Sequence, residues 1–325
     1  MKRKLLLTSL LVTIVCLFSE DYIYRATFLQ SVNINARAAG MGGAYAALAN
    51  GAAGLYWNPG ATAFGSDIDL IMAYSHLGRM AGVNDFYFSG VRHSLVEMIN
   101  LTIGYGFSMQ YFGEAGFFSE KKIKLNTGAR MPIPLGVTDF LEVGLGLNLS
   151  IMGLDARTEY EFKTRTISLD IGAKAYYKNI KVLKGAFALG LNIKNLIPSS
   201  YSLYTEDVKV KLTPEIITSL AYEAKYLTAA AGVKFINTFE RLCLGLEGKY
   251  KGLALRYGFI IKAPAYNAAS AYTYEPDSGV SFSSLANSFG IGFQTGPHFN
   301  VDLAYSAGFS QFSYGTLSGS MQAHF

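Results

Sequence analysis

Along most of the chain, apolar residues alternate with polar or small ones at every second position. In residues 141–151 the apolar side chains stand at the odd positions, and glutamate, glycine, asparagine and serine stand between them. A β-strand turns successive side chains to opposite faces, whereas an amphipathic helix repeats its apolar residues every three or four positions. The alternation returns in four further segments, 167–175, 242–249, 253–261 and 299–305. The pattern predicts an all-β protein.

The whole chain divides into about fourteen such segments, each near the ~10 residues that a tilted strand needs to cross a membrane. An even number of strands is typical of single-chain bacterial barrels. We therefore expect a transmembrane antiparallel β-barrel of about 14 strands. The strands are expected near 67–76, 84–93, 99–112, 121–131, 139–151, 166–177, 184–194, 214–224, 227–236, 241–250, 252–262, 283–294, 298–307 and 317–325.

The connections between these strands differ in length. Membrane barrels have short periplasmic turns and longer external loops. Connections 152–165, 195–213 and 263–282 are long and follow odd strands, whereas 225–226, 251 and 295–297 are short and follow even ones. The first strand is thus expected to run outward from the periplasm. Two connections do not fit this rule, because 237–240 is short and 132–138 is long.

The first 19 residues have the pattern of a signal peptide. A basic start, Met1 to Lys4, precedes an apolar stretch from Leu5 to Phe18, which is too short for the ~20 residues of a membrane-spanning helix. We expect export and cleavage after Ser19. The segments then read as 1–19 signal peptide, 20–66 amino-terminal segment and 67–325 barrel. The residue before Cys16 is not small, which argues against a lipoprotein.

Composition supports a membrane barrel. The 325 residues are 50% hydrophobic with 22 Tyr and 22 Phe, and only 16% are charged, against ~25% in typical soluble domains. Abundant aromatic residues fit the girdles that barrels place at both membrane surfaces. The formal charge of +5 is scattered, which argues against nucleic acid as a partner. A water-soluble β-sandwich stays open as the alternative.

The last strand ends in an aromatic residue, Phe325, which shares one face with four small or apolar residues before it. Such an ending resembles the signal read by the barrel-assembly machinery, which we expect as a partner together with outer-membrane lipid.

A run of small residues precedes the first strand. It reads RAAGMGGAY at 37–45, AALANG at 46–51 and LYWNPG at 55–60. This run resembles the amino-terminal signature of the FadL-like outer-membrane proteins, and within them the PorV/PorQ subgroup. The chain departs from that signature in two places. Ala49-Asn50-Gly51 lacks the usual acidic pair, and Gly60 stands where the family generally has alanine.

The resemblance implies a hatch, in which segment 20–66 forms short helices inside the barrel and plugs its lumen. It also implies the outer membrane of a diderm bacterium, and ligand movement coupled to the hatch. We expect a helix across 39–48 and a rigid elbow at Pro59, which restricts the residue before it to an extended conformation. A simpler interpretation is that 57–59 is only a turn that seats the plug. The hatch and gating candidates are Arg37, Gly40, Gly42, Gly43, Trp57, Asn58 and Pro59.

Charged residues on the polar faces of the strands form a second group. By alternation they face the lumen, since a charge on lipid near the bilayer centre would cost ~2–4 kcal/mol. One interpretation is that they pair with one another and with the hatch. The other is that Lys234 or Arg256 attracts a ligand carboxylate. The group consists of Glu142, Asp170, Lys174, Lys234, Glu247, Lys249, Arg256 and Asp302.

The sequence gives little sign of catalysis, so we expect neither an enzyme nor a cofactor. The four histidines show no metal-ligand spacing. Gly40-Met41-Gly42-Gly43 lacks the third glycine and the preceding strand of a dinucleotide loop. His93 and Ser94 are neighbours in the chain and are not expected to meet as a catalytic pair.

Two functions are compatible with these features. The first is passive uptake of a hydrophobic compound such as a long-chain fatty acid, with lateral exit where glycines weaken the wall at 102–108. The second is a PorV-like barrel that holds a secretion-system partner through external loops. The contact candidates are Tyr201, Tyr204, Tyr272 and Tyr274.

Overall fold

The computed structural model describes most of the chain from residue 33 onward. The described ranges are 33–77, 82–114, 118–135, 140–157, 161–180, 184–197, 200–202, 209–236, 238–262, 285–308 and 315–325. The expected signal peptide, Cys16, the whole 263–282 connection and Tyr204, Tyr272 and Tyr274 lie outside these ranges.

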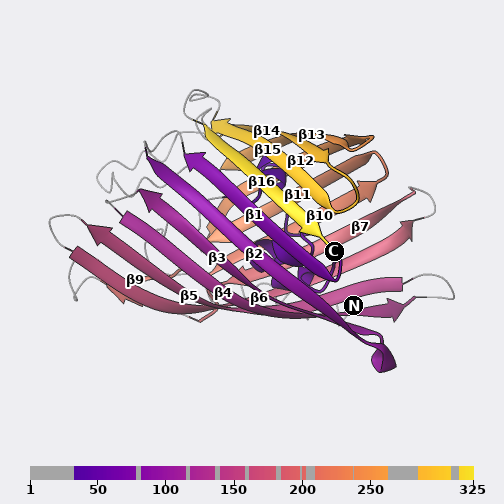
Figure 1. Cartoon of the computed structure of the whole chain (residues 1–325), viewed down its shortest axis with the longest axis horizontal. Helices are drawn as coiled ribbons and strands as arrows, with labels where there is room; N and C mark the ends of the chain where they lie inside the picture. The colour runs from indigo at the N-terminus through magenta and orange to yellow at the C-terminus, as the bar shows by residue number, and fades with distance from the viewer. Residues whose placement is uncertain are drawn as a thin grey trace.

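The main sheet is a closed antiparallel barrel of fourteen strands, which confirms the expected fold class. Each strand pairs with its neighbour in the chain, and β16 pairs back onto β1, where Leu70 lies opposite Ala323 (Figure 1). The strands are β1 (Ile68–Leu77), β2 (Val83–Val96), β3 (Leu101–Glu114), β4 (Phe118–Pro134), β5 (Phe140–Arg157), β6 (Glu161–Ile180), β7 (Gly185–Lys194), β10 (Glu215–Ala224), β11 (Leu227–Ile236), β12 (Thr238–Tyr250), β13 (Leu253–Lys262), β14 (Leu285–Gln294), β15 (Phe299–Gly308) and β16 (Thr316–His324).

Besides 237–240, where β12 begins at Thr238, three expected connections contain strand residues. β5 runs to Arg157 and β6 begins at Glu161, so the expected loop 152–165 is mostly strand, and β4 likewise reaches Pro134. The apolar alternation of β5 ends near residue 151, but its pairing with β6 continues to Arg157 and Glu161. The third connection, 195–213, contains a small separate sheet of β8 (Ser200–Ser202) and β9 (Lys209–Lys211).

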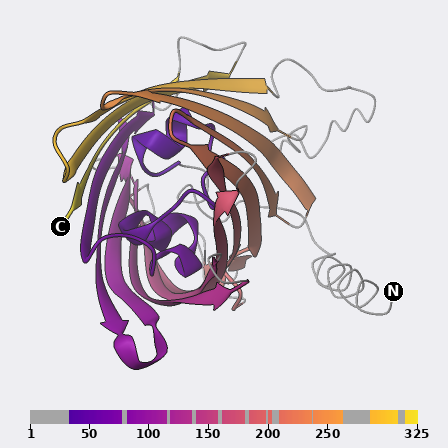
Figure 2. The ribbon, with the colours of Figure 1, turned by 90° about the vertical axis from the view of Figure 1, so that its right-hand side faces the viewer.

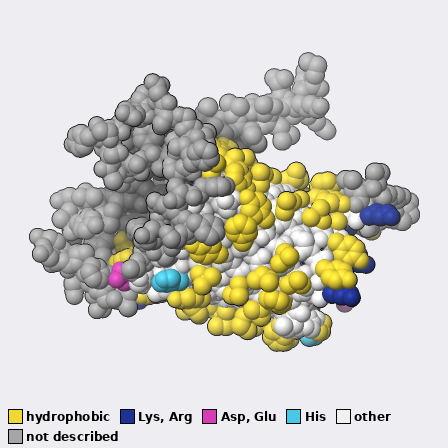
Figure 3. All heavy atoms as spheres, turned by 90° about the horizontal axis from the view of Figure 1, so that it is seen from above, with side chains coloured by type: hydrophobic (Ala, Val, Ile, Leu, Met, Phe, Trp, Pro, Cys, Tyr) yellow, Lys and Arg dark blue, Asp and Glu magenta, His cyan; other side chains and the backbone are white. Residues whose placement is uncertain are grey.

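The two faces of the barrel wall differ in polarity, as the alternation predicted. On β5, Leu145 on the outer face is 61% exposed, whereas Asn148 on the inner face is fully buried. The outer face is dominated by leucine, isoleucine, phenylalanine, methionine and tyrosine (Figure 3). The apolar side chains of this face are compatible with a hydrocarbon environment. The main chain is compatible with it as well, because a closed barrel pairs its main-chain polar groups between neighbouring strands.

The carboxyl terminus closes the barrel. The amide of Phe325 donates to the carbonyl of Ile68 at 2.9 Å, and the amide of Ile68 donates back at 3.0 Å. The Phe325 ring packs edge-on against Phe299, with 5.8 Å between ring centroids. Recognition of this end by an assembly machinery stays a prediction.

The segment before β1 fills the lumen as a plug, which Figure 2 shows inside the barrel. Its short helical pieces are α2 (Ala36–Gly40), η2 (Gly51–Ala53), α3 (Gly54–Trp57) and η3 (Pro59–Ala61), and one further turn, η4 (Glu97–Ile99), joins β2 to β3. The expected helix across 39–48 is wrong. α2 ends at Gly40, because Gly42 and Gly43 take positive φ angles of 66° and 82° that a right-handed helix excludes.

None of the helices among the described residues is both long and apolar enough to cross a membrane.

Candidate functional site: the plugged lumen

Arg37 fixes the first helix of the plug to the barrel wall. Its guanidinium donates to both carboxylate oxygens of Glu247, from Nε at 2.9 Å and from Nη2 at 2.7 Å. The same carboxylate accepts from Arg256 Nε at 2.6 Å and lies 3.0 Å from Lys249 Nζ. Arg256 also pairs with Asp302 at 2.7 Å. These luminal charges therefore pair with one another and with the plug, which is the first of the two interpretations.

Asn58 forms the elbow of the plug and bridges to the wall. Its backbone is extended, with φ −166° and ψ 105°, as the following Pro59 requires. Its side-chain oxygen accepts from the amide of Gly60 at 3.0 Å and so caps η3. Its side-chain nitrogen donates to the carbonyls of Ala46 at 3.1 Å and Ala173 at 2.9 Å. One buried amide thus joins two parts of the plug to β6.

Trp57 lies at the centre of the plug. Its indole nitrogen donates to the carbonyl of Ile34 at 3.0 Å, and its ring packs edge-on against Tyr45 and Tyr56. From the wall, Asn192 donates to the Trp57 carbonyl at 2.9 Å. Burial raises the pKa of the Tyr56 hydroxyl well above its usual value, so the ring stays neutral. Trp57 thus joins the beginning of the plug, at Ile34, to the elbow at Asn58.

Glycines on the inner face of the wall allow the plug backbone to contact the strand backbones. A Cβ at Gly172 would lie 2.6 Å from Pro59 Cδ, and one at Gly245 would lie 2.6 Å from the Met41 carbonyl oxygen. Several of these glycines are direct cross-strand partners, so they form a row around the barrel. We call this row the glycine belt; it consists of Gly104, Gly128, Gly144, Gly146, Gly172, Gly190, Gly232, Gly245, Gly258 and Gly290.

The two departures from the family signature have structural counterparts. A Cβ at Gly60 would lie 2.7 Å from the carbonyl oxygen of Gly172 and 2.8 Å from that of Gly144, so the wall leaves no room for alanine. Where the acidic pair is missing, the buried ammonium of Lys174 donates to Asn50 Oδ1 at 2.6 Å and to the Ala49 carbonyl at 2.8 Å. The lysine is thus bound by neutral oxygens of the plug.

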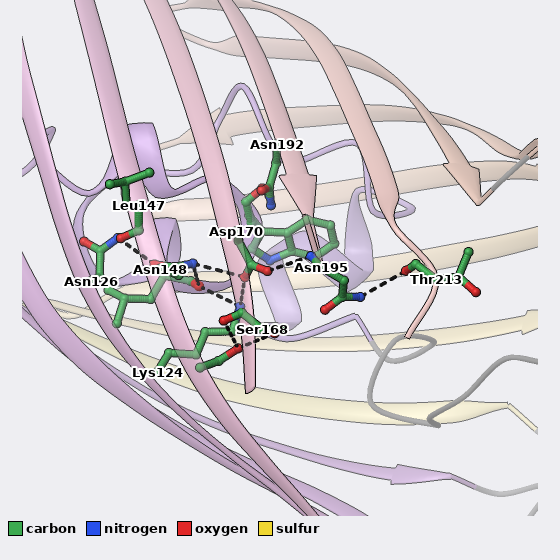
Figure 4. Close-up of polar contacts among 12 residues, drawn as sticks. Lys124, Asn126, Leu147, Asn148, Ser168, Asp170, Asn192, Asn195 and Thr213 are labelled. Carbon is green, nitrogen blue, oxygen red and sulfur yellow. Dashed lines mark hydrogen bonds and ion pairs between the residues drawn. The ribbon is translucent and has the colours of Figure 1, made fainter. Parts of the chain in front are cut away.

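A second polar network lies on β4, β5 and β6 (Figure 4). Lys124 Nζ is 2.8 Å from Asp170 Oδ2, and Asp170 Oδ1 accepts from the amide of Asn195 at 3.1 Å. Lys124 and Asn148 both donate to the carbonyl of Leu55 in α3, at 3.2 Å and 2.9 Å. The network satisfies a carbonyl at the end of a short helix, which would otherwise be left unpaired.

Two small cavities lie between the plug and the wall, each of about 20 Å³, which is room for about one water molecule. Both are lined by Tyr56 and Lys194. Lys194 is 6% exposed, and its ammonium lies 4.1 Å from the centroid of the Tyr56 ring. Five cationic side chains and one carboxylate line the two cavities together: Lys122, Lys124, Lys194, Lys234, Arg241 and Glu215.

Of the two luminal ligand candidates, only Lys234 lines one of these cavities. It contacts Glu215 at 3.0 Å and Glu240 at 3.2 Å, beside a register shift between Lys234 and Phe235. Arg256 pairs with two carboxylates beneath α2. Gly40 lies against Gly290, Gly42 against Gly258, and Gly43 lines the first cavity.

Sequence reasoning missed Lys124 and Lys194 and the glycine belt. The alternation on β4 and β7 could have placed both lysines inward, but nothing in the sequence shows which strands face which part of the plug. The expected weakness of the wall at 102–108 is not found. β3 pairs there with β2 and β4 without a shift in register, and Gly104 contacts the plug.

The fold is that of several solved channels. A structure described as the "CymD monoaromatic hydrocarbon channel" is 13% identical, with a TM-score of 0.56 over 90% of this chain and 98% of that one. A FadL homologue of Pseudomonas aeruginosa is 12% identical, with a TM-score of 0.54 over 90% and 99%. The Pseudomonas putida toluene transporter TodX is 13% identical, with a TM-score of 0.52 over 88% and 96%.

No family model matches this chain, and no curated protein sequence matches it. The structural likeness therefore defines a class by fold alone, the closed fourteen-stranded barrel with an amino-terminal plug in its lumen.

Proposed function

We propose that this protein is a passive channel of the outer membrane that takes up hydrophobic compounds and catalyses no reaction. The observation that carries the proposal is the combination of an apolar outer wall with a lumen closed by an amino-terminal plug. Two solved barrels of the same fold, described as a monoaromatic hydrocarbon channel and a toluene transporter, support it.

The cations around the two cavities favour a ligand with a carboxylate, such as a long-chain fatty acid. Lys194 lines both cavities, and no hydrogen bond or ion pair joins its ammonium to another described residue. Lys234 and Arg241 line the first cavity beside it. A carboxylate at this point would receive charge-assisted hydrogen bonds from groups that are already in place. Arg256 is less suited, because it lines neither of the two cavities.

Ligand binding to the purified full-length protein tests this function. We expect saturable binding of oleate, and Lys194→Gln is expected to weaken it about tenfold, since a hydrogen bond to a charged group contributes about 1.5–3 kcal/mol. Lys121→Gln is the matched control, because Lys121 is exposed on the outer side of β4. Binding of toluene with no binding of oleate would support the channel function and would exclude a fatty acid as its ligand. Failure to bind either compound would contradict the channel.

The closed lumen also favours a second candidate, a PorV-like component of a secretion system. Each of the two cavities found among the described residues has room for about one water molecule, so a long-chain ligand would enter only if the plug moved. Such a role needs only the outer loops, where Tyr201 lies in β8. Purification of the tagged full-length protein from native membranes separates the two. Stoichiometric recovery of secretion components, together with absent ligand binding, would support the second candidate.

A further inference from the structure

Three successive short turns at one end of the barrel each carry an exposed lysine. Lys184 precedes β7, Lys225 joins β10 to β11, and Lys251 joins β12 to β13. The turns are neighbours on the rim, because β7 pairs with β10 and β11 pairs with β12. No ion pair or hydrogen bond links these three ammonium groups to other residues in the described ranges. We call the three residues the lysine collar.

The backbone at two of these lysines is unusual. Lys184 has φ 48° and Lys251 has φ 47°, in the left-handed region that side chains with a Cβ rarely adopt. Every other non-glycine residue with positive φ in the described chain is an asparagine: Asn35, Asn100 and Asn195. At Lys251-Gly252, where both φ angles are positive, Asn-Gly is the strongly preferred pair. Asparagine would adopt this backbone conformation with less strain than lysine. A lysine at such a position therefore points to a function for its side chain.

Tyrosines beside the collar indicate its depth in the membrane. Tyr226 and Tyr250 are 57% and 63% exposed. Lys225 Nζ lies 4.8 Å from the centroid of the Tyr226 ring, and Lys251 Nζ lies 5.3 Å from that of Tyr250. Exposed tyrosines of membrane proteins gather at the level of the lipid head groups. An ammonium held against such a ring is therefore at the level of the lipid phosphates.

The collar covers only part of the rim. The turn between β2 and β3 carries Glu97 and the exposed Met98 instead, and the turn between β14 and β15, residues 295–298, has no lysine. A general preference for basic turns would have distributed lysines evenly. Among the described residues of the short turns, the exposed lysines gather beside β7 and β10–β13, so the surface is suited to one localised anionic partner.

We propose that the lysine collar binds the phosphate groups of anionic phospholipids in the membrane leaflet at the short-turn end, which is the periplasmic end in barrels of this kind. The inference rests on the membrane location in the proposed function and is independent of the ligand of the channel. A lysine near a negatively charged bilayer surface contributes about a fivefold gain in affinity. Three neighbouring lysines then select anionic over neutral lipid.

Electron paramagnetic resonance of spin-labelled lipids tests the collar. The full-length protein is reconstituted in phosphatidylcholine vesicles that contain a trace of spin-labelled phosphatidylglycerol or spin-labelled phosphatidylcholine. We expect the wild-type wall to immobilise the anionic lipid severalfold more strongly. The triple variant Lys184→Asn, Lys225→Gln, Lys251→Asn is expected to bind both lipids almost equally, and asparagine suits the two left-handed positions, so the variant should fold.

Two controls separate charge from structure. The triple lysine-to-arginine variant should keep the selectivity, and Glu97→Gln, on the opposite part of the rim, should not change it. Salt at about 1 M should remove the selectivity of the wild type, because the Debye length is then about 3 Å. Equal lipid selectivity in the wild type and in the asparagine/glutamine variant would overturn the proposal that the lysine collar binds anionic lipid. Absence of any immobilised lipid would instead contradict the membrane location and with it the proposed function.

Discussion

Glu247 is the residue on which the first helix of the plug depends. Its side chain is fully buried and contacts Arg37, Arg256 and Lys249. Glu247→Gln would keep the shape but leave two arginine charges without their shared carboxylate. Breaking a buried ion pair in this way typically costs about 3–5 kcal/mol. We expect α2 to detach from the wall, with faster hydrogen–deuterium exchange of the amides at 36–45.

Lys249→Gln provides the control for that substitution. Lys249 binds the same carboxylate, but its side chain is 36% exposed. An ion pair of an exposed side chain contributes at most about 1 kcal/mol, so exchange at 36–45 should stay close to that of the wild type. Equal protection of the plug in Glu247→Gln and in the wild type would show that the glycine belt alone holds α2.

At the scale of elements, η3 and the glycine belt fit each other without space for a methyl group. A Cβ at Gly146 would lie 2.5 Å from the carbonyl carbon of Pro59 and 2.9 Å from the amide of Gly60. We expect Gly146→Ala to displace η3 and open the lumen to small hydrophilic solutes. Single-channel conductance in planar bilayers measures this opening, and the fluorescence of Trp57, the single tryptophan, reports the exposure of the plug.

Gly153→Ala is the matched control on the same strand. A Cβ there would have its nearest neighbour, the Thr164 carbonyl oxygen, at 3.7 Å, which is ordinary contact. Its conductance should equal that of the wild type. If the conductance of Gly146→Ala also equals that of the wild type, the plug can shift without opening the lumen. The glycine belt would then not be the feature that closes the lumen.

The strands of the barrel could largely be predicted from the sequence, but the contacts between the plug and the wall could not. Alternation with period two places the strands, because one face meets an apolar surface and the other a packed lumen. It could not show that β5 continues to Arg157 and that β6 begins at Glu161, since the apolar alternation has ended there. The signature at 37–60 indicated a plug, but its partners depend on strand register. Lys194 and the belt therefore emerge only from the three-dimensional structure.

At the scale of the whole molecule, the apolar outer wall makes the membrane location testable by one substitution. Leu145 lies on the outer face of β5, near the middle of its apolar stretch, and is 61% exposed. In a bilayer, Leu145→Arg would put a charge into hydrocarbon and should lower the free energy of unfolding by about 2–4 kcal/mol. In water the same change at an exposed site would stay within about 0.5 kcal/mol. Urea titration of protein folded into lipid vesicles, followed by Trp57 fluorescence, measures the difference.

Met98→Arg, in the η4 turn where the side chain is 91% exposed, is the control and should have almost no effect on the free energy of unfolding. Equal stabilities of the two variants would contradict a lipid-facing wall, because then Leu145 would meet water as Met98 does.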